Sequence, residues 1–105
     1  MDPSDPANVL PLEGEIDLRT SPRLENSLLR MIKKRPPHVV VDLSGVTFID
    51  SSGLAVLIRA MQDVQKYGGK LRLSGMNENV RPIFEIARLD QIFLIDRQSD
   101  ELLAD

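Results

Sequence analysis

An acid, two hydroxyls and a glycine stand side by side as Asp50, Ser51, Ser52 and Gly53, immediately before an apolar stretch. Asp and Ser are preferred at helix amino termini, where their side-chain oxygens accept hydrogen bonds from free backbone N–H groups. A serine hydroxyl there is also a phosphate acceptor, and a phosphate brings about −1.5 to −2 charges at pH 7. The positive end of the helix dipole tolerates such an anion. The motif therefore allows a helix cap at Asp50 or Ser51, a phosphorylation switch, or both.

The apolar stretch after the motif predicts a helix over residues 51–67. At about 100° per residue one face is apolar and belongs to the core; it carries Leu54, Leu57, Ile58, Met61 and Val64. Val56 is expected roughly opposite that face, as an exposed valine beside the suspected site, which favours a docking surface. A phosphate on Ser51, next to Asp50, would then weaken a desolvated interface through repulsion and the loss of hydration.

Other residues that could do chemistry give little support for an enzyme. Asp17 and Asp50 would be a carboxylate pair only if the fold joined them, and loop carboxylates are the simpler interpretation. His38 is the only histidine and the chain has no cysteine, which excludes thiol catalysis and thiolate metal sites. No nucleophile–base pair is visible. We therefore expect no enzyme activity, no metal and no cofactor.

Length and charge narrow the class of protein further. With 105 residues, 42% hydrophobic and 28% charged, the chain suits one globular domain. A net charge of −3 argues against a general nucleic-acid binder. No apolar run is long enough to span a membrane, and the start has no secretory-signal pattern. These features indicate a cytoplasmic bacterial protein that binds no nucleic acid and does not insert into membranes. Lys33 to Arg35 read as a helix terminus, with an anion-binding patch as the alternative.

The order of predicted elements alternates between strand and helix, which indicates an α/β fold. Pro11 predicts that the first strand lies at a sheet edge or is irregular, and the run from His38 to Leu43 predicts a strand buried on both faces or nearly so. The predicted elements are a flexible tail over 1–7, strands over 8–12, 38–43, 46–50, 70–75 and 92–96, a turn over 14–17, a bend at 44–45, and helices over 20–35, 51–67, from 77 or 78, and over 99–105.

Three stretches, taken together, resemble the STAS domain of bacterial anti-sigma-factor antagonists over Val9 to Ile95. They read LEGEIDLRTSPRLE, VVVDLSGVTFIDSSGLAVLIRAM and GGKLRLSGMNENVRPIFEIARLDQIF. The resemblance implies a single STAS domain over residues 8–105, with a mixed sheet of four to five strands and helices packed mainly on one face. It also implies binding to an anti-sigma factor that is itself a serine kinase, which frees a sigma factor.

The resemblance also implies roles for individual residues. Ser51 would be the phosphoacceptor, phosphorylated by the kinase and reset by a phosphatase. The partner-binding residues would be Asp17, Asp50, Ser52 and Gly53, and Val56 joins them from the helical pattern. The motif continues with Ala55, where switch-type members more often have glycine. That variant suits an alternative, an unphosphorylated accessory subunit of a lipid-trafficking ABC transporter; a scaffold protein of a stress-sensing assembly is a third candidate.

Overall fold

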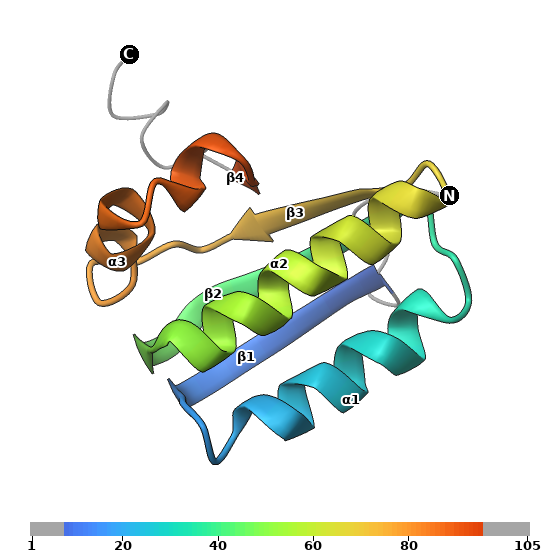
Figure 1. Cartoon of the computed structure of the whole chain (residues 1–105). Helices are drawn as coiled ribbons and strands as arrows, with labels where there is room; N and C mark the ends of the chain where they lie inside the picture. The colour runs from blue at the N-terminus through green and yellow to red at the C-terminus, as the bar shows by residue number, and fades with distance from the viewer. Residues whose placement is uncertain (1–7, 96–105) are drawn as a thin grey trace.

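The computed structural model of the chain describes residues 8–95. The described elements alternate between strands and helices, as predicted (Figure 1). In chain order they are β1 (Val9–Ile16), α1 (Ser21–Ile32), β2 (His38–Ile49), α2 (Ser51–Lys66), β3 (Lys70–Ser74), α3 (Arg81–Ile86), the short 3-10 helix η2 (Leu89–Gln91) and β4 (Leu94–Ile95). The predicted tail over residues 1–7 and the predicted helix over 99–105 lie outside the described residues.

The four strands form one sheet in the order β1-β2-β3-β4. This confirms the α/β fold class, with one correction: every strand pair among the described residues is parallel, whereas a mixed sheet was predicted. The reason is that each connection between described strands crosses over through a helix, which returns the chain to the same end of the sheet. Strand β1 lies at an edge, so Pro11 stands where proline is tolerated, as predicted.

Strand β2 corrects two further predictions. The bend expected at Ser44 and Gly45 does not end the strand, which runs unbroken from His38 to Ile49. Two shifts in its pairing with β1 curve it instead, since Pro11 pairs with Asp42 but Glu13 pairs with Gly45. The same pairing extends β1 through Ile16, so the turn expected over 14–17 begins only at Asp17.

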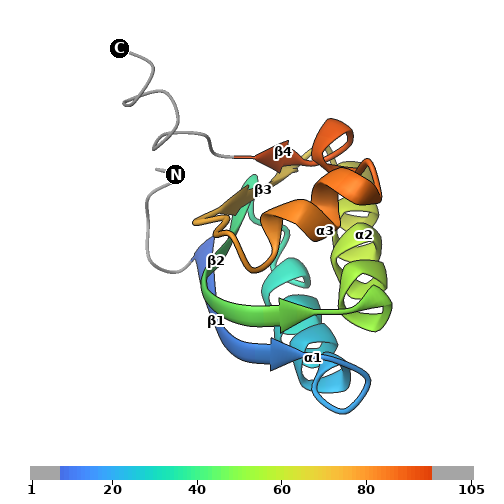
Figure 2. The ribbon, with the colours of Figure 1, turned by 90° about the vertical axis from the view of Figure 1, so that its left-hand side faces the viewer.

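Helices α1 and α2 pack side by side on the same face of the curved sheet (Figure 2). Alternate residues of β2 face these helices and are fully buried, whereas Val40 and Asp42 on the other face are half-buried. The strand is therefore buried on one face, not on both. The core residues of the two helices are Leu24, Leu28, Ile32, Leu54, Leu57, Ala60, Met61 and Val64.

The parallel topology gives the molecule two unlike ends. The carboxyl ends of β1 and β2 lead into Asp17 and Asp50, which therefore meet at one end of the sheet. Because α1 and α2 run back along the sheet, their carboxyl termini and the amino ends of β2 and β3 meet at the other (Figure 1). We call these the carboxyl end and the amino end.

Candidate functional site

Asp50, and not Ser51, caps helix α2. The Asp50 carboxylate accepts hydrogen bonds from the backbone N–H groups of Ser52 at 2.9 Å and Gly53 at 3.3 Å. The Ser52 hydroxyl donates to the same carboxylate at 2.5 Å. Ser51 is the first residue of the helix; its side chain is exposed, and its hydroxyl has no hydrogen-bond partner within residues 8–95. The capping role and the free hydroxyl thus fall on different residues.

The hydrogen bonds to Asp50 also set its charge state. The Ser52 hydroxyl, together with the backbone N–H groups of Gly53 and Ser52, holds the pKa of Asp50 below its usual range. Desolvation and the nearby negative charge of Asp17 act in the opposite direction but are weaker in sum. The carboxylate is therefore ionised at neutral pH, one residue before Ser51.

Asp17 organises the neighbouring loop. Its carboxylate accepts the backbone N–H groups of Arg19 at 2.9 Å and Thr20 at 3.2 Å, and forms an ion pair with the Arg19 guanidinium at 3.4 Å. Desolvation raises the pKa of Asp17, but the hydrogen bonds of Arg19 and Thr20 and the charge of Arg19 outweigh it and lower the pKa. The Thr20 hydroxyl, at the residue before α1, accepts a hydrogen bond from the backbone N–H of Asp17 and donates one to the carbonyl of Glu15. The loop is thus held in one conformation by its own residues.

Two contacts join the loops after β1 and β2 into one site. The backbone N–H of Asp50 donates to the carbonyl of Ile16 at 3.1 Å, immediately before Asp17. Gly53 packs against the ends of both strands: a Cβ there would lie 2.6 Å from Ile16 Cγ2 and 2.8 Å from Ile49 Cγ1. Only glycine allows α2 to begin this close to the sheet. Gly53 is buried, so it shapes the site from below and offers no surface to a partner.

Val56 does not lie where the helical pattern placed it. It is half-buried and packs against the core, because α1 runs alongside α2 and covers that side of the helix. It lines a groove of about 330 Å³ between the two helices, together with Leu28 and Leu29 of α1. The residue that is exposed next to Ser51 on the helix surface is Ala55.

Leu18 is a surface residue that the sequence did not reveal. Its side chain is 76% exposed in the loop between Asp17 and Arg19, at the same end as Ser51. A single leucine between a predicted turn and a predicted helix carries no pattern, and isolated exposed leucines are common, so only the fold could single it out. The carboxyl end thus combines the negative charges of Asp17 and Asp50 with an exposed leucine.

The described residues hold no obvious metal site or membrane span. Within residues 8–95 no three His, Cys, Asp or Glu side chains are grouped as metal ligands. No helix in the same part of the chain is long and apolar enough to cross a membrane. His38 starts β2 and so lies at the amino end, away from Ser51.

Comparison with known proteins identifies the family. The sequence profile of the STAS domain matches residues 2–102, nearly the whole chain. The chain belongs to the STAS domain family. The anti-sigma-B factor antagonist of Bacillus subtilis is 30% identical over 89 residues, which cover 85% of this chain and 81% of that protein. Its counterpart in Listeria monocytogenes is also 30% identical, covering 85% and 78%.

A solved structure agrees with the STAS assignment. The crystal structure of an anti-sigma factor antagonist from Mycobacterium paratuberculosis superimposes with a TM-score of 0.78 at 30% identity, covering 91% of this chain and 81% of that one. Each of the relatives named here is described as an antagonist of an anti-sigma factor.

Proposed function

We propose that this STAS domain is an anti-sigma-factor antagonist switched off by phosphorylation of Ser51. The observation that carries the switch is the free, exposed hydroxyl of Ser51 at the first position of α2, beside a cap that Asp50 already supplies. The regulatory role is supported by relatives at 30% identity that carry the name antagonist. The partner is an anti-sigma factor with serine-kinase activity, which binds the ATP, and a phosphatase resets the cycle. A protein that controls a sigma factor in this way works in the bacterial cytoplasm.

The arrangement explains how a phosphate would act on a partner and spare the fold. Asp50 already occupies the backbone N–H groups of Ser52 and Gly53, and the Leu54 N–H bonds to the carbonyl of Asp50 at 3.0 Å. Most of the first-turn donors that normally hold an anion at a helix terminus are therefore taken. A phosphate on Ser51 would stay directed outward, toward whatever docks there.

Neighbouring charges increase the effect of that phosphate. Asp17 and Asp50 are close enough for the charge of Asp17 to influence the pKa of Asp50. A phosphate on Ser51 would lie between these two carboxylates and the partner. Binding would then require the phosphate to lose its hydration next to two negative charges, which lowers the affinity for the partner. In this proposal the partner contacts Asp17, Leu18 and Asp50 around Ser51. Ser52 holds the Asp50 carboxylate in place. Gly53 lets the first turn of α2 lie close to the sheet.

Val56 needs a revised part in this proposal. Since it is half-buried between α1 and α2, it meets a partner only at the edge of the docking surface. A Val56→Asp change would also place a carboxylate in the groove against Leu28 and Leu29, so it would lower stability as well as binding. Substitutions at Leu18 and Ala55 test the docking surface more cleanly, because both side chains are exposed.

The test is phosphorylation by the serine-kinase anti-sigma factor of the source organism, purified and supplied with ATP. Intact-mass analysis should show one added phosphate, and peptide mapping should place it on Ser51. Ser51→Ala should abolish the modification and still bind the kinase. Ser52→Ala is the matched control: it removes the neighbouring hydroxyl and should still be phosphorylated. A phosphate on Ser52, or none on either serine, would refute the switch, and the second result would favour the transporter-subunit alternative.

A further inference from the structure

Five cationic residues gather at the amino end of the molecule, opposite Ser51. Lys33, Lys34 and Arg35 follow one another at the end of α1, Lys66 ends α2, and Lys70 begins β3. We call these five residues the basic end. All five are exposed, and residues 33–38 and 66–70 contain no Asp or Glu. Five of the thirteen Lys and Arg residues of a chain with a net charge of −3 thus lie together at this end.

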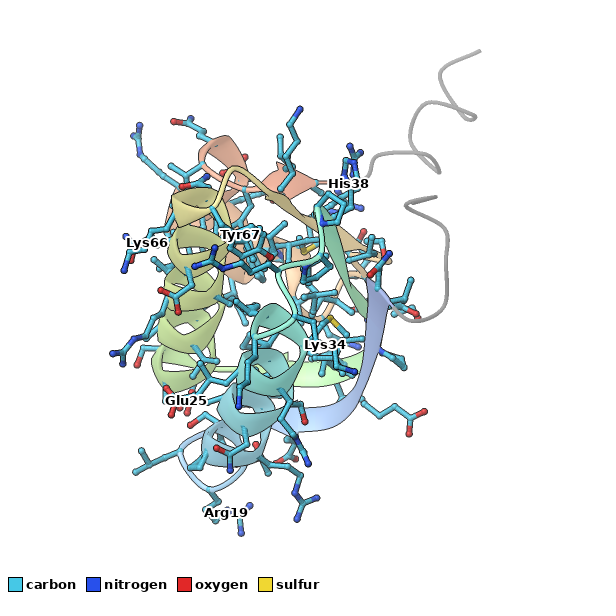
Figure 3. The ribbon with its side chains drawn as sticks, turned by 90° about the vertical axis from the view of Figure 1, so that its right-hand side faces the viewer. Arg19, Glu25, Lys34, His38, Lys66 and Tyr67 are labelled. Atoms are coloured by element: carbon cyan, nitrogen blue, oxygen red, sulfur yellow. The ribbon has the colours of Figure 1, made fainter. Side chains whose placement is uncertain are left out.

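The basic end is held in shape by bonds between its two loops. The backbone N–H of Lys70 donates to the carbonyl of Pro37 at 2.9 Å, and the Tyr67 hydroxyl donates to the carbonyl of Pro36 at 2.8 Å. Figure 3 looks at this end and shows Lys66 extending outward from α2, with Tyr67 between Lys66 and His38. The cations therefore stand on a fixed frame and not on loose loops.

Arg35 fits that frame at some conformational cost. Its backbone φ is 53°, in the left-handed region where glycine is the usual residue at the end of a helix. The Arg35 guanidinium lies 6.0 Å from the centre of the Tyr67 ring, a distance at which cation and ring attract. The strain is local, and it directs a permanent positive charge onto the surface that the two loops share.

These charges are not accounted for by partners inside the described chain. Of the five residues only Lys66 forms an ion pair, with Asp63 at 3.5 Å, among the four ion pairs within residues 8–95. A helix dipole favours Lys33 and Lys66, which lie at helix carboxyl termini. Its influence falls off beyond the last turn, so it acts less on Lys34 and Arg35, which follow the capping residue Lys33, and not on Lys70, which begins β3.

We propose that the basic end is a second interaction surface, which binds an acidic, extended segment of another protein. The whole-chain charge of −3 opposes long-range attraction to a nucleic-acid polyanion, while a short peptide senses the local cluster. A membrane surface would favour apolar side chains beside the cations. None of the large exposed apolar side chains of residues 8–95 belongs to the basic end; they are Leu18, Leu29, Phe48, Ile86, Ile92 and Leu94.

The two surfaces operate independently. Helix α2 spans 16 residues between Ser51 and Lys66, which is about 24 Å at 1.5 Å per residue. That exceeds the screening length of about 8 Å at physiological salt. A phosphate on Ser51 therefore leaves binding at the basic end unchanged, and the domain can keep an acidic protein attached while the carboxyl end releases its partner.

The test uses a fluorescein-labelled peptide of about ten glutamates, about 33 Å long when extended, and measures binding by fluorescence anisotropy. We expect Lys33→Glu with Lys70→Glu to weaken binding about tenfold or more. Arg19→Glu with Arg23→Glu is the matched control, because it changes the net charge equally at the carboxyl end; it should weaken binding less than about threefold. The double variant Lys33→Gln, Lys70→Gln should bind the peptide with an affinity between those of the two charge-reversed proteins.

Several results would overturn this inference and leave the Ser51 switch untouched. One is equal weakening by both charge-reversed proteins, which would show that only net charge matters. Another is tighter binding, in the same buffer, to a labelled DNA duplex or to vesicles containing phosphatidylserine than to the peptide. Circular dichroism should show all variants folded. The Lys33→Glu, Lys70→Glu protein should still be phosphorylated on Ser51, so a failure of either proposal is distinguishable from a failure of the other.

Discussion

The two ends of this STAS domain treat polar groups in opposite ways. At the carboxyl end the carboxylates of Asp17 and Asp50 are each held by several hydrogen bonds, whereas the Ser51 hydroxyl makes none within residues 8–95. At the amino end the backbone is held by Tyr67 and Lys70, while the cationic side chains have almost no partners in residues 8–95.

The two ends are therefore suited to different kinds of regulation. The hydrogen bonds of Asp17 and Asp50 fix the geometry of the carboxyl end. The Ser51 hydroxyl, which makes no such bond, is then a specific point for modification. Cationic side chains without ion-pair partners are not held in one conformation. The basic end therefore suits a flexible acidic peptide that can adjust to it. Both ends follow from one topology, since parallel strands with returning helices gather helix amino termini at one end and carboxyl termini at the other.

The largest effect on the carboxyl end is expected from Gly53→Val. The added Cβ would lie under 3 Å from atoms of both Ile16 and Ile49, so the start of α2 must move. We expect a loss of about 1–3 kcal/mol from overpacking, measured by urea unfolding. Ala55→Val, on the exposed side of the same helix, is the control and should cost less than about 0.7 kcal/mol, the difference in helix propensity between alanine and valine. Equal losses would mean that Gly53 does not set the position of the helix.

A smaller effect separates the cap from the hydroxyl. Asp50→Ala removes the acceptor of two backbone N–H groups and should cost about 0.5–2 kcal/mol in urea unfolding. Ser51→Ala should stay within about 0.5 kcal/mol of the unmodified protein, because the hydroxyl makes no bond within the described residues. If Ser51→Ala proved the more damaging of the two, the division of roles between these residues would be wrong.

The smallest effect is a dependence on pH. The pKa of Asp50 is lower in the folded state than in the unfolded state, where it is about 3.9. The ionised carboxylate therefore stabilises the fold above the unfolded pKa. That stabilisation is lost as the pH falls through the lower pKa of the folded state. Asp50→Asn keeps a capping side chain without titrating there. The stability difference between wild type and Asp50→Asn should therefore narrow as urea midpoints are taken from pH 6 toward pH 3. A difference that stays constant over this range would contradict the lowered pKa.

The sequence predicted those features that depend on local pattern. Helix α2 was visible from residue types and spacing, with Asp50 or Ser51 as its cap, and Pro11 indicated a strand that is at an edge or irregular. What it could not settle depends on contacts between segments. Val56 was expected to be exposed because the helical pattern of α2 does not show that α1 packs alongside it. Ser44 and Gly45 were expected to break the strand because the sequence of β2 does not show its pairing with β1. The same holds for the exposure of Leu18 and for the hydrogen bond between Lys70 and Pro37 that joins the two loops of the basic end.

Whether a phosphate on Ser51 acts on the partner or on the fold is the most direct question. It is answered by purifying the unmodified and Ser51-phosphorylated proteins and measuring, for each, the affinity for the serine-kinase anti-sigma factor and the urea midpoint. We predict that phosphorylation lowers the affinity about tenfold or more and leaves the midpoint nearly unchanged. Equal affinities, or an affinity loss matched by a large fall in the midpoint, would contradict the account.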